Sequence, residues 1–274
     1  MNKQKNRFTI AAVQFCATED KKENLTLLNQ FIQSAIKKNA DIVVLPEVSN
    51  CCGRKEVMVE NAEQIPGYTT DFFSDIAKKS GISIVCGSIF EKAEKNKVFN
   101  TSVIVGSDGE ILAKYRKIHL FDVDISGGIR YKESGHVTAG DEIVSVNLGN
   151  FDAGLVICYD LRFCEIFRVL ALRGAKIIFL PAAFTLATGK YHWEPLIKAR
   201  AIENQVFIVA ANQIGTSQNN ITCYGKSMIV DPWGRVLAEA EDDENIICAE
   251  IDLAVLDTVR AEIPTFNHRR IDLY

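Results

Sequence analysis

Apolar residues fall into two kinds of run along this chain, and the two kinds alternate. Short runs that are apolar at nearly every position, such as residues 8–15 and 40–47, are typical of strands buried on both faces of a sheet. Longer segments with an apolar residue every three or four positions, such as 22–38, are typical of amphipathic helices. The pattern predicts an α/β fold in which helices cover apolar sheets.

The same order of elements occurs twice. The predicted strands are 8–15, 40–47, 82–90, 153–160, 175–182 and 205–213, and the predicted helices are 22–38, 69–80, 163–173 and 191–204. A strand-turn-strand hairpin closes each half. Local sequences also match, since NADIVVLPE corresponds to GAKIIFLPA and SVIVGSDGEILAK to SMIVDPWGRVLAE. This internal repeat indicates two pseudo-equivalent βαβαββ halves.

Strands that are apolar throughout need cover on both faces of their sheet. Helices cover one face of each sheet, and packing the two sheets together covers the other. We therefore predict a four-layer α-β-β-α sandwich, formed by a single domain over residues 1–274. A last strand at 245–251 leads to a short helix and an irregular end. We expect the C-terminal tail 252–274, which mixes aromatic and basic residues, to contribute to a dimer contact.

Composition narrows the class of protein. The 274 residues are 47% hydrophobic and 24% charged, with a net charge of −4 and no basic stripe, so neither nucleic acid nor an anionic membrane is an expected partner. No apolar run reaches the ~18 residues of a membrane span. The polar start MNKQKNRFT lacks the apolar core of a signal peptide, which predicts a cytoplasmic protein. The eight cysteines form no CxxC pair and the four histidines are scattered, so we expect no metal and no cofactor.

The two halves differ at positions just past the ends of strands. Glu47 follows Leu-Pro in the first half, where the second half has Ala182. Cys158 follows the first strand of the second half, and Lys117 ends the first hairpin. Since sites in α/β sheets assemble at the carboxyl ends of strands, these three residues are candidates for a site.

A thiol, a carboxylate and an ammonium together suit acyl transfer. A thiolate at a turn from strand to helix attacks a carbonyl or nitrile carbon and forms a thioester. The carboxylate takes the thiol proton and returns a proton to the leaving amine. The ammonium, with the backbone N–H of Tyr159, holds the oxyanion. Each residue also has an ordinary interpretation: Cys158 as a small buried hydrophobe, Glu47 as a helix cap or a solvated loop residue, and Lys117 as part of a solvated cationic run. Their conjunction favours the functional interpretation.

At these positions the sequence resembles the nitrilase (carbon–nitrogen hydrolase) superfamily over essentially its whole length. The matching segments are LPE at 45–47, YRKIHLFD at 115–122, YKES at 131–134, CYDLRF at 158–163, LPAAFT at 180–185, HWEPLIKARAIENQ at 192–205 and YGKSMIVDPWG at 224–234. The resemblance implies a dimeric α-β-β-α sandwich. It also implies that Glu47 is the general base and acid, Lys117 the oxyanion stabiliser and Cys158 the nucleophile, and that Glu133 positions Lys117 or the substrate.

Within the superfamily the chain looks like the branch of small amidases that contains ω-amidase and deaminated-glutathione amidase. KIHLFDVD and YKES resemble the former, whereas HRRIDLY and AANQ resemble the latter. The resemblance implies a small-molecule amide substrate that carries a carboxylate. Arg162 and Thr188 match residues that contact this carboxylate, and Phe184 matches a residue that lines the pocket. A bidentate arginine suits a carboxylate, but an ion pair of Arg162 with Asp160 or Glu165 is an equal alternative.

The chain departs from the family where RFPE usually follows the nucleophile, because Cys164 stands in place of the proline. Proline suits the first turn of a helix, so we expect the cysteine to make the protein slightly less stable. A disulfide between Cys158 and Cys164 is a further possibility that the sequence allows. Two other functions fit the same sequence. One is hydrolysis of a nitrile or an N-carbamoyl amine at the same site, and the other is a non-catalytic binding protein on the same fold.

Overall fold

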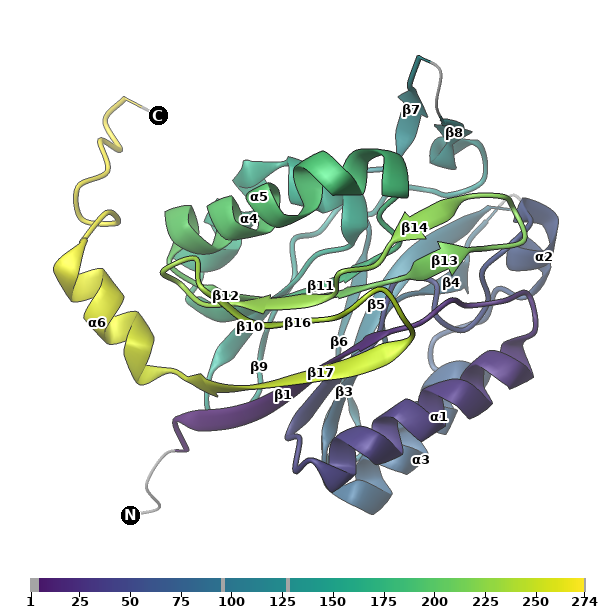
Figure 1. The fold of residues 1–274 in the computed structure, drawn as a ribbon, viewed down its shortest axis with the longest axis horizontal. Coiled ribbons are helices and arrows are strands. Elements are labelled where there is room, and N and C mark those ends of the chain that lie inside the picture. Colours follow the sequence, from purple (N-terminus) through teal and green to yellow (C-terminus); the bar gives the residue numbers. More distant parts are fainter. Residues whose placement is uncertain (1–4, 95–96, 127–128, 274) are drawn as a thin grey trace.

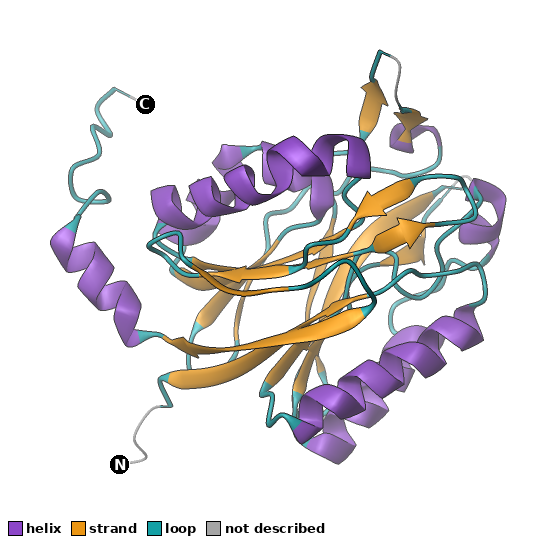
Figure 2. Cartoon of the chain, viewed as in Figure 1, coloured by secondary structure: helices purple, strands orange, loops and turns teal. Residues whose placement is uncertain are grey.

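Two β-sheets pack face to face at the centre of the protein, and helices lie on the outer side of each (Figures 1 and 2). The computed structural model describes residues 5–94, 97–126 and 129–273. Residues 1–4 of the predicted domain and residue 274 of the predicted tail lie outside the described residues. The predicted α/β class with four layers is confirmed.

The first sheet is built mainly from the first half of the chain. Its order is β17 (Asn245–Asp252), β1 (Arg7–Gln14), β2 (Ile42–Val44), β3 (Ser83–Val85), β5 (Val98–Val105) and β4 (Ile89–Lys92), with β6 (Ile111–Arg116) also paired to β5. β1, β2 and β3 are parallel, while β5 runs antiparallel to β3 and to β6. The strand predicted at 82–90 is in fact two strands, β3 and β4, separated by a turn at Gly87, whose φ is +64°.

The second sheet repeats this arrangement. Its order is β16 (Val236–Glu239), β15 (Met228–Val230), β12 (Phe207–Asn212), β11 (Ala175–Ala182), β10 (Asp152–Leu155) and β9 (Ser145–Asn147). β10, β11 and β12 are parallel, while β15 runs antiparallel to β12 and to β16. The five strands β1, β2, β3, β5 and β6 thus correspond in order and direction to β10, β11, β12, β15 and β16, as the internal repeat predicts.

Alternate residues of β1 belong to different layers. Ile10 and Ala12 face the second sheet and pack in the core between the two sheets. Ala11 and Val13 point the other way, into a separate core beneath the helices of the first half. Because successive side chains of a strand point to opposite faces, this division is what makes a continuously apolar strand stable here.

Helices form the outer layers. They are α1 (Lys21–Lys37), α2 (Lys55–Glu60), α3 (Tyr68–Ser80), α4 (Cys164–Leu172), α5 (Leu186–Asn204) and α6 (Ala254–Glu262). Figure 1 shows α1 and α3 on the side of the first sheet and α4 and α5 on the side of the second. α5 begins five residues before the predicted start at 191. The sequence pattern did not predict α2.

Two small hairpins stand outside the main sheets. They are β7 (Asp122–Asp124) with β8 (Arg130–Lys132), and β13 (Ile214–Thr216) with β14 (Thr222–Tyr224). The first lies in the stretch 119–142, which has little pattern in the sequence. Two 3₁₀ turns, η1 (Glu133–Gly135) and η2 (Cys158–Arg162), follow β8 and β10.

The last strand, β17, belongs to the first sheet rather than the second. β17 pairs antiparallel with the whole of β1, and α6 and the tail then leave the sandwich (Figure 1). Within the described residues, no helix has both the length and the apolar character that crossing a membrane requires.

Candidate active site

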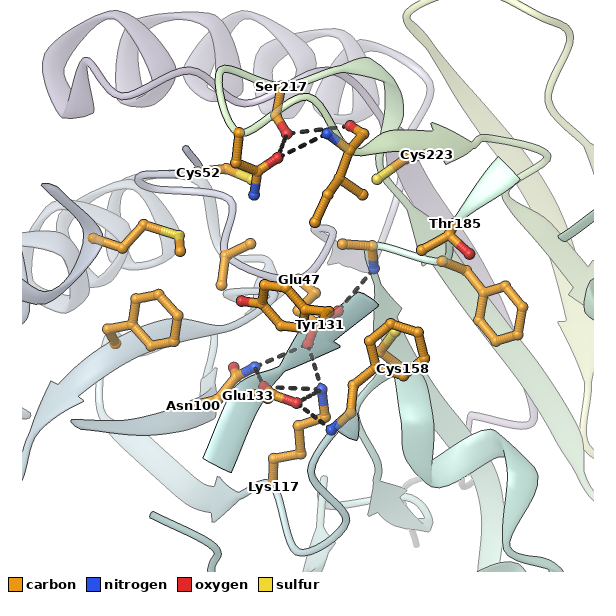
Figure 3. Close-up of a pocket in the computed structure, with 18 of the residues that line it drawn as sticks. Glu47, Cys52, Asn100, Lys117, Tyr131, Glu133, Cys158, Thr185, Ser217 and Cys223 are labelled. Carbon is orange, nitrogen blue, oxygen red and sulfur yellow. Dashed lines mark hydrogen bonds and ion pairs between the residues drawn. The ribbon is translucent and has the colours of Figure 1, made fainter. Parts of the chain in front are cut away.

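One pocket collects side chains from both halves of the chain. Its volume is about 90 Å³. It is lined by Glu47, Val48, Cys52, Met58, Phe90, Asn100, Lys117, Phe121, Tyr131, Glu133, Cys158, Arg162, Ala183, Phe184, Thr185, Thr188, Ser217, Asn219, Ile221 and Cys223. The structure thus brings together seven of the eight residues for which the sequence predicts a role. Figure 3 labels four of them, which are Glu47, Lys117, Glu133 and Cys158. The exception is Tyr159, whose ring packs on Phe121 outside the lining; the role predicted for this residue belongs to its backbone N–H.

Glu47 lies three residues past the end of β2 and is buried. Its Oε2 accepts a hydrogen bond from the backbone N–H of Ala183 at 2.8 Å, in the second half of the chain. The next residue, Val48, has a φ of +47°, which is unusual for a β-branched side chain. Its N–H donates to the Ser88 hydroxyl at 2.9 Å, which helps to hold the turn. The carboxylate is therefore fixed at the seam between the two halves.

Lys117 directly follows β6 and is only 2% exposed. Its Nζ donates to Glu47 Oε1 at 2.9 Å and to the two carboxylate oxygens of Glu133 at 3.1 and 3.0 Å. Burial lowers the pKa of Lys117, but Glu133 and then Glu47 outweigh this and hold the pKa well above its usual value. The ammonium is therefore charged, and Glu133 orients it (Figure 3).

Cys158 begins the 3₁₀ turn η2, three residues past the end of β10. Its φ is +44°, a left-handed conformation that is strained by about 1–3 kcal/mol for a residue other than glycine. Burial, followed by the negative charge of Glu47, raises the pKa of the Cys158 thiol well above its usual value, although Lys117 opposes this. The resting sulfur is therefore a neutral thiol next to a carboxylate.

The helix predicted at 163–173 is α4, and its observed bounds agree with the prediction within one residue. The strand predicted to reach residue 160 ends at Leu155, and the 3₁₀ turn η2 lies between it and α4. Cys158 therefore lies in a 3₁₀ turn between strand and helix and not at the first turn of α4. Cys158 and Cys164 are both free thiols; Cys158 is buried and Cys164 exposed.

Arg162 and its neighbours form a second part of the pocket. The Arg162 guanidinium lies 5.0 Å from the ring centre of Phe184, and its Nη1 is 3.2 Å from His192 Nδ1. No ion pair to Asp160 or Glu165 forms among the described residues, so that alternative for Arg162 is wrong. The Thr188 hydroxyl lies 3.0 Å from that of Thr185. The pocket thus presents a cation without an acidic partner in the described structure, beside an aromatic ring and a hydroxyl.

The sequence reasoning missed several pocket residues. Asn100 donates to Glu47 Oε1 at 2.8 Å and to Glu133 Oε1 at 3.3 Å, so it bridges the two carboxylates. A buried polar residue in the apolar strand β5 was a signal that could have indicated it. The hairpin of β13 and β14 supplies a wall from alternate positions, which are Ser217, Asn219, Ile221 and Cys223. Nothing in the local sequence of that hairpin indicates where it packs.

The pocket can support thiol chemistry on a carbonyl carbon, because nucleophile, base and cation meet in one place. Within the described part of the chain, no group of three or more His, Cys, Asp or Glu is arranged to hold a metal ion.

Fold and pocket together define a class, the four-layer α/β hydrolases with a cysteine, a lysine and glutamates in one pocket. Comparison with known families agrees, since the family described as carbon-nitrogen hydrolase matches residues 9–261. The chain belongs to this family, as its resemblance to the superfamily predicts.

Individual relatives match over nearly the full length. The chain is 40% identical to "Omega-amidase NIT2" of Homo sapiens over 267 residues, which are 97% of this chain and 96% of the relative. Among solved structures, the C. elegans NitFhit protein gives a TM-score of 0.93 at 38% identity, covering 99% of this chain and 67% of the other. Nit3 of Saccharomyces cerevisiae, described as a member of branch 10 of the nitrilase superfamily, gives 0.88 at 33% identity, covering 98% of both chains.

Proposed function

We propose that this protein is an amidase of the ω-amidase type, which hydrolyses a small amide carrying a carboxylate to an acid and ammonia. One observation carries the proposal. The Cys158 thiol, the Glu47 carboxylate and the Lys117 ammonium share a pocket with Arg162, whose charge has no acidic partner in the described structure. The omega-amidase relatives at 40% identity support the same activity.

In the first step Glu47 takes the Cys158 proton while Sγ attacks the amide carbon. The electron pair of the C=O bond moves to oxygen, and the Lys117 ammonium with the Tyr159 N–H holds this oxyanion. Glu47 then gives its proton to the amide nitrogen, the C–N bond breaks, and ammonia leaves. The product is a thioester on Cys158.

In the second step water hydrolyses the thioester. Glu47 takes a proton from water as the water oxygen attacks the thioester carbon. The C–S bond breaks, the acid leaves, and the proton returns to sulfur. Glu133 and Asn100 keep Lys117 and Glu47 in place through both steps, because each contacts a charged group of the site.

Pocket size and charge indicate which amides fit. The cavity of about 90 Å³ is smaller than the ~300–1,000 Å³ usual for ligand pockets, which favours a small amide. Lys117 is engaged by two carboxylates, which leaves Arg162 to bind an anionic substrate. These features favour the 2-oxo analogue of glutamine, with one carboxylate, over the larger deaminated glutathione, which has two.

A substrate panel tests the proposal. Ammonia release is measured from the 2-oxo analogue of glutamine, deaminated glutathione, a simple aliphatic amide and an aliphatic nitrile, together with hydrolysis of an N-carbamoyl β-amino acid. We expect the highest kcat/KM for the first. Preference for the second would make deaminated-glutathione amidase the function, and preference for the nitrile or carbamoyl compound would place the protein elsewhere in its family. No turnover of any compound would favour a binding protein.

Variants test the assigned roles. Cys158→Ala should abolish turnover, and Lys117→Met should lower kcat by at least ~10²–10³-fold, as loss of an oxyanion donor does. Cys164→Ala is the matched control, because it removes an exposed thiol that does not line the pocket. Substantial turnover by Cys158→Ala would contradict the thioester mechanism.

We also infer a homodimer, with the C-terminal tail 252–274 at the contact. In Figure 1 α6 and the tail extend away from the sandwich, and the large apolar side chains of Ile271 and Leu273 are 74% and 69% exposed. Exposed apolar residues at a projecting end favour burial against a second copy. Light scattering should give twice the monomer mass for the full chain; a monomer at micromolar concentration would contradict the inference.

A further inference from the structure

Asp160 lies two residues after Cys158 and is fully buried. Its carboxylate accepts four hydrogen bonds, two on each oxygen. Oδ1 accepts from the backbone N–H of His119 at 3.2 Å and lies 2.8 Å from His119 Nδ1. Oδ2 accepts from the Tyr115 hydroxyl at 2.7 Å and from the Ile157 N–H at 2.8 Å. The side chain does not line the pocket, so it does not touch a substrate.

The four donors come from two segments that each carry a group of the site. Tyr115 lies two residues before Lys117, and His119 lies two residues after it. Ile157 directly precedes Cys158. A single carboxylate therefore joins the segment that carries the ammonium to the turn that carries the thiol. These segments are far apart in the sequence and belong to different halves of the fold.

Asp160 holds the turn at Cys158, whose backbone is strained. Cys158 has a φ of +44°, and the Asp160 N–H donates to the Ile157 carbonyl at 3.0 Å across it. The Ile157 N–H donates back to the Asp160 carboxylate. Strained backbone persists only where its surroundings fix it. If these bonds were lost, the turn would relax toward negative φ and carry Sγ away from Glu47.

We propose that Asp160 is a positioning residue, which fixes the Cys158 turn against the segment around Lys117. The thiol and the ammonium are thereby kept at the right distance from each other and from the Glu47 carboxylate. The proposal rests on the proposed function in that it assigns reactivity to this cysteine. It adds a buried carboxylate that acts through Cys158 and Lys117 without contacting the substrate.

The role needs a carboxylate rather than any polar side chain of the same shape. An asparagine at this position has one acceptor oxygen and one NH₂ group. If the NH₂ replaces Oδ2, it faces the Ile157 N–H; if it replaces Oδ1, it faces the His119 N–H. Either orientation sets donor against donor in a buried site, so Asp160→Asn should disturb the turn although it conserves volume.

The test measures Cys158 alkylation by iodoacetamide at pH 8, followed by mass spectrometry, alongside kcat and KM. In Asp160→Asn we expect the alkylation rate and kcat each to fall about 10–100-fold, the range that loss of hydrogen bonds to a charged group gives. KM should change less than about threefold, because no residue that binds the substrate is altered. A loss that appears in KM alone would overturn the proposal.

Two further sets of variants separate positioning from general destabilisation. Asp231→Ala removes another buried carboxylate, which accepts backbone N–H bonds from Trp233 and Arg235 in the β15–β16 turn and does not line the pocket. It should lower Tm while leaving the alkylation rate of Cys158 unchanged. Tyr115→Phe removes one donor to Asp160 and should lower the rate about 2–10-fold, which keeps the proposal testable if Asp160→Asn does not fold.

The outcomes distinguish this proposal from the proposed function. Wild-type alkylation rates in both Asp160→Asn and Tyr115→Phe would overturn the positioning role, whatever the substrate. A wild-type protein that hydrolyses none of the panel, with a Cys158 alkylation rate that still depends on Asp160, would overturn the amidase proposal alone.

Discussion

At the scale of residues, the pocket of this protein is divided by charge into two parts. Lys117 is paired with two glutamates at hydrogen-bond distance, so the part of the pocket around Lys117 holds the groups that carry out the reaction. Arg162 has contacts with His192 and with aromatic rings but with no carboxylate of the described structure. An unpaired guanidinium beside a pocket suits a carboxylate of the substrate.

This division predicts the effect of Arg162→Gln. On the 2-oxo analogue of glutamine, kcat/KM should fall about 10–100-fold, the value of a hydrogen bond to a charged group. On a simple aliphatic amide, which has no carboxylate, the same variant should act nearly as the wild type does. Steady-state ammonia release with both substrates measures this. An equal loss on both would contradict carboxylate recognition and would instead indicate a structural role.

The residues that meet in the pocket could be predicted from the sequence, but their protonation states and hydrogen-bond partners could not. Glu47, Lys117 and Cys158 were found because each breaks the repeat between the halves, and the resemblance added Glu133. The protonation state of Cys158 could not be predicted, since it depends on burial and on a glutamate more than a hundred residues away. Asn100 was not predicted as a site residue for the same reason, because both of its carboxylate partners are distant in sequence.

At the scale of elements, α4 shows what the substitution of the family proline does. Cys164 is the first residue of α4, and the preceding Phe163 has φ −109° and ψ 100°, which a residue before proline readily adopts. The N–H of the first helical residue has no partner within its helix, so proline would remove nothing there. The departure from the family is therefore compatible with the same backbone.

Cys164→Pro should accordingly stabilise the protein, by reducing the freedom of the unfolded chain. We expect a gain of about 0.4–1 kcal/mol, or a rise in Tm of about 1–4 °C. Differential scanning calorimetry under reducing conditions measures it, with Cys164→Ala to separate loss of the thiol from gain of the ring. A lower Tm for Cys164→Pro than for Cys164→Ala would contradict this account.

Long periodic elements were predictable and short ones were not. α1 and β11 lie within one residue of their predicted bounds, because their periodicity is strong over many residues. The hairpin of β7 and β8 has few apolar residues, and its position depends on Glu133 accepting a bond from the Phe121 N–H at 2.6 Å. Such an element is held by tertiary contacts, and local pattern alone cannot predict it.

At the scale of the whole molecule, buried thiols make stability depend on pH. Burial raises the pKa of Cys52 to about 12 and also raises the pKa of Cys86 and Cys223. In the unfolded chain these thiols lose their protons near pH 8.5. Above that pH the folded state therefore binds more protons than the unfolded state, and the free energy of unfolding falls as pH rises.

We expect Tm to fall steadily from about pH 8.5 upward, with each such thiol contributing up to about 1.4 kcal/mol per pH unit. Cys52→Ala should make the fall less steep between pH 9 and about 12, although the cavity lowers Tm at every pH. Thermal unfolding in a reductant across this range measures both slopes. Identical slopes for the variant and the wild type would contradict the assignment to Cys52.

The pairing of β17 with β1 has a consequence for how the protein is made. β1 is synthesised long before its partner, which is complete only at residue 252. At 5–20 residues per second, translation leaves that edge of β1 open for roughly 12–50 s. An apolar strand with an open edge can pair with other chains. Nascent chains should therefore need shielding until β17 has been made, and chains that stop before β17 should give aggregates rather than partial enzymes.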